Sequence, residues 1–390
     1  MRRQLAILSV LLVAAAVLSA CTEDLPVGST DTTAVGDMPD SGILTNADPL
    51  ADEVVEIVEQ ALPELDLQTV LFGVWVGDEE IARGALDASA VQPATSPDAR
   101  VRVGQPMEAM LATILLQLGS EGVIDLDASV AEYVPDLANA DLITPRMLAN
   151  STGGTPDYVR NTAFQDRVAA DPFAGYTFDE LLDFAQQSPP LFEPGTSWAY
   201  SHTEMAVLVE VLERASGESL QDLMASRIFE PLGMTASSAH RNNEISEPVM
   251  HAFTNARGVY EDSTFWDPTW GLNGGMNASV VDLARWLRAL NAGELLDTDE
   301  AEEILSPVTV GLGTMTEDRY FAYGSMVQEG WILGNPNLNG YMGFTAQQRD
   351  PSVTIVVWTT AAPGNAAESN ASQAIAERIA AILSVTPFEM

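Results

Sequence analysis

Lysine is absent from this 390-residue sequence, so all 17 basic residues are arginine, set against 56 acidic residues and a formal net charge of −39. Any reaction that depends on a lysine side chain is therefore excluded. The shortage of basic residues also argues against a nucleic-acid partner, because phosphate backbones are bound by basic surfaces. The single cysteine, Cys21, excludes a disulfide bond within the chain.

Long apolar runs are also scarce, and the most prominent one lies near the N-terminus. Arg2 and Arg3 precede an apolar run from Leu5 to Leu18, which is short for a membrane span and typical of an export signal. The letters "LSAC", ending at Cys21, resemble the lipobox of bacterial lipoproteins. We therefore expect residues 1–20 to be a lipoprotein signal peptide and Cys21 to carry a lipid. The protein would then be anchored at the extracytoplasmic face of the cell membrane. An ordinary signal peptide with an incidental cysteine is the alternative.

The segment after this signal has the composition of a linker. Residues 21–47 are rich in Gly, Pro, Ser, Thr and Asp, which predicts a flexible tether. From residue 48 onward the patterns are those of a folded domain, which we expect to span residues 48–390.

Strand and helix signals lie near both ends of this domain. Residues 69–76 and the β-branched run 353–359 predict strands. Residues 48–65 and 370–383 have the apolar spacing of amphipathic helices. The two chain ends should therefore meet in one sheet.

The middle of the chain, about residues 105–299, is mostly helix and loop by the same criteria. These patterns predict an α+β fold, with an antiparallel sheet flanked by helices and an inserted, mainly helical region. The sheet part would comprise about residues 48–104 and 300–390.

Five segments, in a fixed order, carry a resemblance to a known family. They are "GVIDLDASVAEYVPDL", "ITPRMLANSTGGTPDYV", "FEPGTSWAYSHTEMAVLVEVLERASG", "GLNGGMNASVVDLARWLRALNAGELL" and "GYMGFTAQQRDPSVTIVVWTT". Their order and spacing resemble the superfamily of serine β-lactamases and penicillin-binding proteins, on the branch of class C β-lactamases, D-alanyl-D-alanine carboxypeptidases and esterases. The resemblance runs from about Asp48 to Leu383 and implies a β-lactamase/transpeptidase-like fold.

The catalytic motifs of that superfamily are altered here. Acyl transfer in the family uses a serine that opens a buried helix and a lysine one turn later on the same face. In "VRVGQPMEAMLATILLQL" these positions are Gln105 and Glu108. The Tyr-x-Asn motif becomes Tyr200 with His202, and none of the eight tyrosines has Asn two residues later. Because an amide is not a nucleophile and a glutamate would repel an oxyanion, the resemblance implies a degenerate site without a catalytic residue that can be assigned.

The third family motif, Lys-Thr-Gly or His-x-Gly, falls within "GNPNLNGYMGF". Its register is open between Asn335–Asn337 and Asn337–Asn339, the latter followed by Gly340, and neither register contains lysine or histidine. With Glu108 in the place of the family's lysine, we expect a cleft that does not recruit anionic groups.

Two loop tryptophans are further candidates for the cleft. Trp266 and Trp270 precede the glycine-rich segment near residue 274 and are candidates to line a groove for a sugar or a peptide, with core packing as the alternative. Glu108 and His202 offer too few ligands to predict a metal site, and no cofactor is expected.

Two functions therefore stay open. The first is a cell-envelope lipoprotein with a serine-hydrolase fold that is catalytically inactive. It would bind a cell-wall fragment, such as a peptidoglycan-type peptide or saccharide, or an envelope protein. The second is an active carboxypeptidase, esterase or β-lactamase that uses a non-standard site. The absence of lysine favours the first.

Overall fold

A computed structural model describes residues 42–88, 91, 94–272, 274–350, 352–365, 370–383 and 388. The predicted signal peptide, Cys21 and the tether as far as residue 41 lie outside these residues. None of the helices in the described part of the chain combines the length and the apolar character that a membrane span requires.

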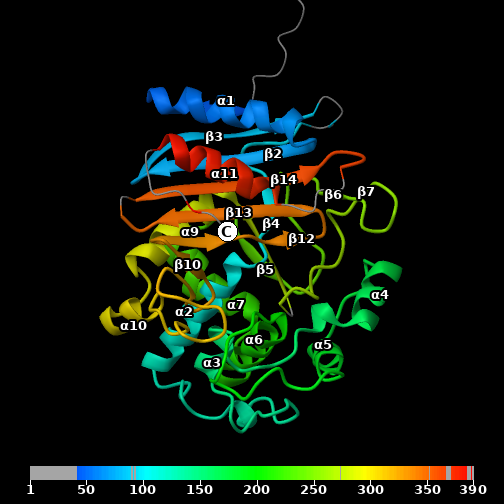
Figure 1. Cartoon of the computed structure of the whole chain (residues 1–390), viewed down its shortest axis with the longest axis vertical. Coiled ribbons are helices and arrows are strands. Elements are labelled where there is room, and N and C mark those ends of the chain that lie inside the picture. Colours follow the sequence, from blue (N-terminus) through cyan, green and yellow to red (C-terminus); the bar gives the residue numbers. More distant parts are fainter. Residues whose placement is uncertain are drawn as a thin grey trace, which may run out of the picture. The chain divides into compact units, whose positions relative to one another are not determined.

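The main sheet joins the two ends of the domain, as predicted (Figure 1). Its paired strands are all antiparallel, and strand β14 lies directly beside β2, with Val353 opposite Val76 and Thr359 opposite Val70. In spatial order the strands are β1 (Ile43–Thr45), β3 (Glu79–Asp87), β2 (Leu67–Val76), β14 (Val353–Ala361), β13 (Tyr341–Gln348), β11 (Trp331–Gly334), β10 (Met326–Gln328) and β9 (Arg319–Phe321), with β12 (Asn337–Leu338) paired to β13.

Strand β1 corrects the predicted extent of the tether. Ile43 pairs with Gly84 and Thr45 with Ala82 of β3, so the last residues of the predicted 21–47 tether belong to the edge of the sheet. The short strand adds backbone hydrogen bonds at an edge that would otherwise expose unpaired groups.

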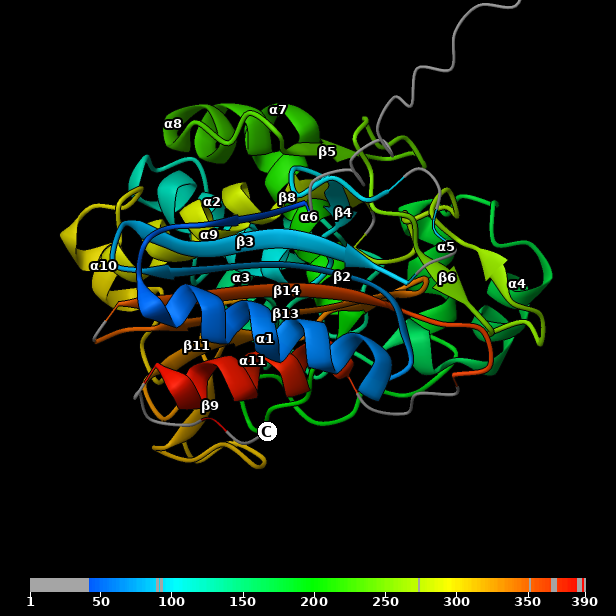
Figure 2. The same ribbon diagram turned by 90° about the horizontal axis from the view of Figure 1, so that it is seen from above.

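Two helices cover one face of the sheet, and Figure 2 shows them side by side. They are α1 (Pro49–Glu64) and α11 (Ala371–Ile382), both close to the bounds predicted from the sequence. Val58 of α1 and Ile379 of α11 pack in one buried cluster with strand side chains such as Phe72. Leu71, the next residue along β2, belongs to the cluster on the opposite face, as the alternation of side chains along a strand requires.

The remaining helices lie in the region between the two sheet-forming segments. They are α2 (Pro106–Ser120), α3 (Pro145–Ala149), α4 (Thr162–Ala170), α5 (Phe178–Ala185), α6 (His202–Ser216), α7 (Leu220–Met224), α8 (Glu230–Leu232), α9 (Val280–Ala292) and α10 (Thr298–Glu303). Side-chain caps fix several starts, since the Ser279 hydroxyl accepts from the Asp282 N–H at the start of α9. Gly217 and Gly293 end α6 and α9 with φ of +74° and +66°, a conformation that glycine adopts readily.

The central region is mostly helix and loop, as predicted, and it also contains short strands. It contributes β5 (Ser238–His240) and β8 (Gly275–Ser279) to a three-stranded sheet with β4 (Arg100–Arg102). It also contains a hairpin of β6 (Phe253–Thr254) and β7 (Glu261–Asp262). These strands are two to five residues long, too short for residue alternation to distinguish them from loops.

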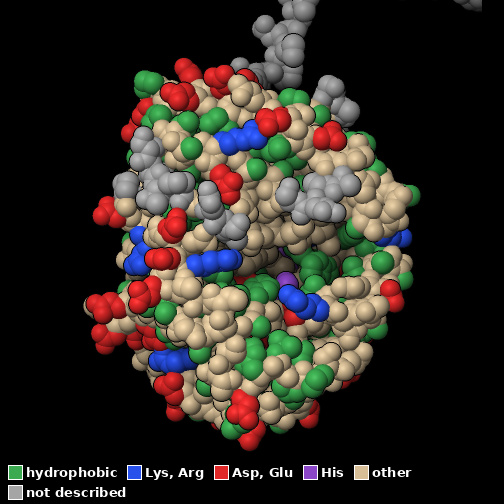
Figure 3. Space-filling model, viewed as in Figure 1, with side chains coloured by type: hydrophobic (Ala, Val, Ile, Leu, Met, Phe, Trp, Pro, Cys, Tyr) green, Lys and Arg blue, Asp and Glu red, His purple; other side chains and the backbone are tan. Residues whose placement is uncertain are grey.

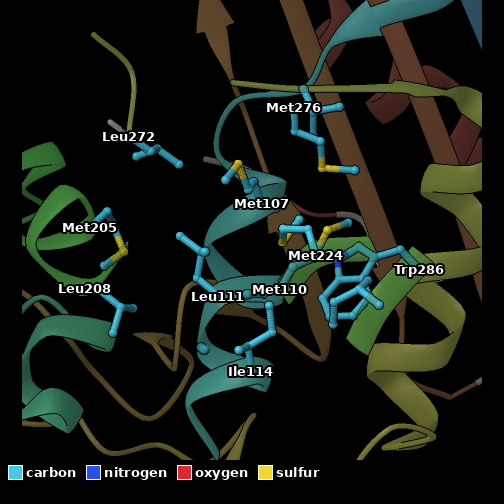
Figure 4. Packing of buried hydrophobic residues seen from close by; sticks show 14 of the residues in the cluster. Met107, Met110, Leu111, Ile114, Met205, Leu208, Met224, Leu272, Met276 and Trp286 are labelled. Carbon is cyan, nitrogen blue, oxygen red and sulfur yellow. The ribbon is translucent and has the colours of Figure 1, made fainter. Parts of the chain in front are cut away.

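Helix α2 passes through the centre of the larger core (Figure 4). Its side chains Met107, Leu111 and Ile114 are buried, and the cluster around them includes Met205 of α6 and Trp286 of α9. A helix that is apolar around its whole circumference is stable in water only when it is enclosed on all sides. The core therefore holds α2 in place, and with it the two polar residues at its start.

Candidate functional site

A cleft of about 370 Å³ opens at the start of α2. Figure 3 shows a hollow on one face of the molecule, with a histidine (purple) and an arginine (blue) at its edge. The cleft lies between α2, the start of α6 and the segment that follows β11. Its lining residues are Gly104, Gln105, Glu108, Trp198, Tyr200, His202, Trp270, Gly271, Leu272, Arg319, Phe321, Met326, Leu333, Gly334, Asn335, Pro336, Asn337 and Leu338.

The four altered motif residues meet in this cleft. Of the four, only Tyr200 keeps the residue type of the family motif. Gln105 directly precedes α2 and Glu108 lies in its first turn. Tyr200 lies just before α6 and His202 is its first residue. The sequence therefore identified four residues from two distant segments that share one site.

Glu108 is a buried carboxyl group whose neighbour is a phenol. The Tyr200 hydroxyl donates a hydrogen bond to Glu108 Oε1. Burial raises the pKa of Glu108 to about 8, opposed by the Tyr200 hydrogen bond and assisted by the negative charge of Asp157. The same burial holds the pKa of Tyr200 well above 10. At neutral pH both groups therefore carry their protons.

His202 is oriented by a carboxylate that the sequence analysis did not single out. Its Nδ1 lies 3.1 Å from Asp157 Oδ2. The Asp157 segment is fixed in turn by α6, because the buried Glu204 accepts from the backbone N–H groups of Gly153 at 3.1 Å and Thr155 at 2.8 Å. This arrangement leaves Nε2 of His202 as the ring nitrogen available to a ligand.

Aromatic side chains form much of the wall. Trp270 lines the cleft, as predicted, and its carbonyl accepts a 2.7 Å hydrogen bond from the Tyr158 hydroxyl. Trp198 and Phe321 line it from another side, with ring centroids 5.6 Å apart. Trp266, by contrast, is 4% exposed and is not among the lining residues. Its predicted role in a groove is therefore wrong, and core packing accounts for its position.

The third motif is represented by the residues directly after β11. Asn335 and Asn337 line the cleft, whereas the predicted Asn339 and Gly340 do not. The Asn339 carbonyl accepts from the Ser263 hydroxyl, and a Cβ atom at Gly340 would come within 2.5 Å of the Phe253 carbonyl oxygen. The register Asn335–Asn337 is therefore the one that faces the ligand space.

A cation lies at the cleft although the sequence predicted none. Arg319 of β9 is exposed and is among the lining residues. No sequence signal pointed to it, because "TEDRYFAYG" resembles none of the family motifs and only the strand order brings β9 to the cleft. The expectation that the site lacks a cation is corrected by this position.

The polar side chains that line the cleft are amides, indoles, a carboxyl group, a phenol, an imidazole and a guanidinium group. Among the described residues that line it, none is serine, threonine, cysteine or lysine. Four of its side chains hold a buried polar atom without a hydrogen-bond partner in the protein: Gln105 Oε1, Glu108 Oε2, Trp198 Nε1 and Trp270 Nε1. Such atoms are rare in folded proteins and mark places where a ligand or water completes the bonding. Within the described part of the chain no cluster of three or more His, Cys, Asp or Glu residues could hold a metal ion.

Comparisons with known proteins agree with this geometry. A family model described as "Beta-lactamase" matches residues 54–380. The penicillin-binding protein PbpX of Bacillus subtilis strain 168 is 25% identical over 245 residues, 61% of this chain and 58% of that protein. A D-aminopeptidase of Cereibacter sphaeroides is 32% identical over 164 residues, 40% of this chain and 30% of the relative. The chain thus spans little more than half, or less, of these relatives.

A solved structure is similar over most of the chain. The D-stereospecific amidohydrolase from Streptomyces sp. superposes with a TM-score of 0.70 at 25% sequence identity, covering 78% of this chain and 94% of that protein. The agreement in three dimensions supports the predicted antiparallel sheet flanked by helices.

The raised pKa of Glu108 predicts that the difference in stability between the wild-type protein and the variant Glu108→Gln depends on pH. The ordinary pKa of 4.5 applies to the unfolded chain and about 8 to the folded one, so the folded protein holds the proton between these pH values. The contribution of Glu108 to the free energy of unfolding is complete below pH 4.5 and is lost as the pH rises to about 8. Glu108→Gln mimics the protonated form, so its stability relative to wild type should increase across that range by a few kcal/mol, at about 1.4 kcal/mol per pKa unit.

Urea unfolding of both proteins at pH 5 and pH 9 measures this difference. Glu218→Gln, which removes an exposed carboxylate, is the control and should differ from the wild type equally at both pH values. Glu204→Gln is no such control, because burial also raises the pKa of Glu204 to about 8. A constant difference between wild type and Glu108→Gln would contradict the raised pKa.

Proposed function

The chain belongs to the β-lactamase family, and from this premise we propose that it is a cell-envelope lipoprotein whose cleft binds a peptide with D-amino acid residues without acylation. The single observation that carries the proposal is the composition of the cleft. The positions from which a serine and a lysine would act hold Gln105 and Glu108, and no other described lining residue is a serine, threonine or cysteine.

The remaining side chains do not replace the missing nucleophile. A carboxamide cannot be deprotonated near neutral pH, and burial raises the pKa of Tyr200 far above that range. Covalent catalysis requires a nucleophile with a lowered pKa or an adjacent base. The Tyr200 hydroxyl instead donates to the Glu108 carboxyl group, so neither group is poised to attack a carbonyl.

The ligand class is inferred from the relatives and from the chemistry of the wall. The similar proteins are named penicillin-binding protein, D-aminopeptidase and D-stereospecific amidohydrolase. Trp198, Trp270 and Phe321 provide apolar contact area, Asn335 and Asn337 provide amide groups, and Arg319 provides a cation. A short cell-wall peptide with small side chains and a terminal carboxylate suits this combination, and an envelope protein that presents such a segment is an equivalent partner.

One observation favours a second function, a weak hydrolase. His202 is held by Asp157 at 3.1 Å in the same cleft, and a histidine oriented by a carboxylate is suited to activating water. Such an enzyme would release product without a covalent intermediate, so acylation and turnover have to be measured separately.

We expect no covalent adduct when the purified protein is incubated with a fluorescent penicillin. Intact-protein mass spectrometry should show the unmodified mass, because the cleft has no group to form the acyl bond. The double variant Gln105→Ser/Glu108→Lys restores both missing groups and should be labelled weakly, whereas Gln105→Ser alone should not be. A stoichiometric adduct on the wild-type protein would refute the proposal, and its mapped peptide would identify the nucleophile. Turnover of acyl-D-alanyl-D-alanine without an adduct would support the hydrolase.

Anchoring through Cys21 is the other part of the proposal, and it rests on the charged start, the short apolar run and the "LSAC" sequence. In its native host the protein should carry a lipid on Cys21 and partition with the membrane. Cys21→Ser should lose the lipid and fail to undergo cleavage of the lipoprotein type. Mass spectrometry of the N-terminal peptide tests this, and an unlipidated wild-type peptide would rule out the anchor.

A further inference from the structure

We propose that Gln105 and Glu108 act together as a hydrogen-bond acceptor and donor that bind a neutral amide group of the ligand in preference to an ester or a carboxylate. This inference rests on the proposed function, since it names the chemical group that the same cleft recognises. It assigns a binding role to the two positions at which acyl-transfer chemistry has been lost.

The two residues are placed to act on one ligand group. They are three residues apart at the start of α2, a spacing that puts side chains on the same helix face. Both line the cleft, and each has one buried side-chain oxygen without a partner in the protein, Oε1 of Gln105 and Oε2 of Glu108. An unpaired buried polar atom costs stability, so two of them on one face of the cleft favour a ligand that pairs with both.

The orientation of the Gln105 side chain defines its free atom as an acceptor. Its Nε2 donates to the Gly324 carbonyl at 3.1 Å, which leaves Oε1 free. Gly334 lies beside this oxygen, and a Cβ atom there would come within 2.5 Å of it. The glycine therefore leaves room at Oε1.

The surroundings of Glu108 define its free atom as a donor. Oε1 already accepts from the Tyr200 hydroxyl. None of the ion pairs found among the described residues involves Glu108, and a buried carboxylate without a cation protonates rather than stay charged. The proton then belongs on Oε2, from which it is donated into a ligand.

Two other titratable groups near Glu108 act on its proton in opposite directions, since the Tyr200 hydrogen bond lowers the pKa of Glu108 and the negative charge of Asp157 raises it. The phenol of Tyr200 contacts it directly, and the charge of Asp157 raises its pKa. Burial raises the pKa of Tyr158 well above its ordinary value, with smaller contributions from Asp157 and Glu108. His202 stacks edge-on to the Tyr200 ring at 5.0 Å between centroids, and Arg319 is exposed at the cleft. The pKa of about 8 that results keeps the donor in place at neutral pH.

An amide is the group that matches this pair. Its carbonyl oxygen accepts from Glu108 Oε2–H, and an N–H of the same ligand residue donates to Gln105 Oε1. The N–H and C=O of one trans peptide bond point in opposite directions, whereas those of one residue in an extended backbone point to the same side. An ester has the carbonyl but no N–H, which leaves the Gln105 oxygen unpaired. A carboxylate offers acceptors only and brings a negative charge against that same oxygen. A site that hydrogen-bonds an N–H discriminates strongly against the analogue that lacks it.

The test uses two probes that do not titrate between pH 6 and pH 9.5. They are N-acetyl-D-alanyl-D-alaninamide and the depsipeptide analogue in which the central N–H is replaced by an ester oxygen. Calorimetry with the full chain in detergent should show the amide binding about tenfold or more tightly than the ester at pH 6.5. At pH 9, one unit above the pKa of Glu108, about one carboxyl group in eleven remains protonated, so wild-type affinity for the amide should fall about tenfold.

Three variants separate the possible outcomes. Glu108→Gln keeps an N–H donor at this position without a charge, so it should bind the amide equally well at pH 6.5 and pH 9. Glu108→Leu should lose the preference for the amide at both pH values. Glu218→Gln removes one exposed carboxylate elsewhere and should behave as the wild type.

The results that overturn the inference differ from those that overturn the proposed function. N-acetyl-D-alanyl-D-alanine, which keeps the terminal carboxylate, is titrated beside the two probes. If the wild type binds none of the three, the proposed ligand class is wrong and the inference fails with it. If it binds the free carboxylate more tightly than the amide, the ligand class stands and the inference is refuted. If both probes bind with equal affinity, and this affinity does not change with pH, the cleft binds D-peptides but Gln105 and Glu108 do not recognise the amide group. Tighter binding of D-alanyl-D-alaninamide, which has a free amine, together with loss of that binding in Glu108→Gln, would show instead that an ionised Glu108 binds an ammonium group.

Discussion

The hydrogen bond from Tyr200 to the buried carboxyl group of Glu108 connects the two helices that bound the cleft. Glu108 lies in the first turn of α2, a helix enclosed by apolar side chains, so no solvent stabilises a charge there. Gly324 closes the other side, since even a Cβ atom at this position would lie 2.4 Å from the Ala109 nitrogen. The requirement that this carboxyl group be neutral and hydrogen-bonded therefore constrains α2, the segment before α6 and the turn between β9 and β10 together.

This constraint is the physical basis of the proposed binding role. In relatives that act by acyl transfer, the same helix face would present a serine and a positive charge. Here it presents a carboxamide and a protonated carboxyl group, which are hydrogen-bonding groups without nucleophilic character. Arg319, the one arginine among the described residues that line the cleft, comes from β9 and not from the third motif. The chain has a net charge of −39, so its overall electrostatic field repels anions. A cation at the cleft attracts the anionic end of a ligand locally despite this field.

Some of these features could be read from the sequence and others could not. Gln105, Glu108, Tyr200 and His202 were predicted because ordered motifs fix their places in the fold, and the sheet was predicted because β2 and β14 are long and β-branched. Arg319 and Asp157 were not predicted as site residues, because one depends on the order of short strands and the other on hydrogen bonds made by Glu204. Trp266 was misplaced because a loop tryptophan has the same sequence signal whether it faces a groove or the core.

The protonation state of Glu108 is the most direct test of this account. Carbon-13 NMR of the full chain labelled at the glutamate carboxyl carbons would follow its titration, with Glu108→Gln and Glu204→Gln identifying the two buried signals. The account predicts that the Glu108 signal titrates near pH 8 and is that of a neutral acid at pH 6.5. A Glu108 signal that titrates near the ordinary value of 4.5 would show a carboxylate at neutral pH, and it would contradict both the donor role and the physical basis of the site.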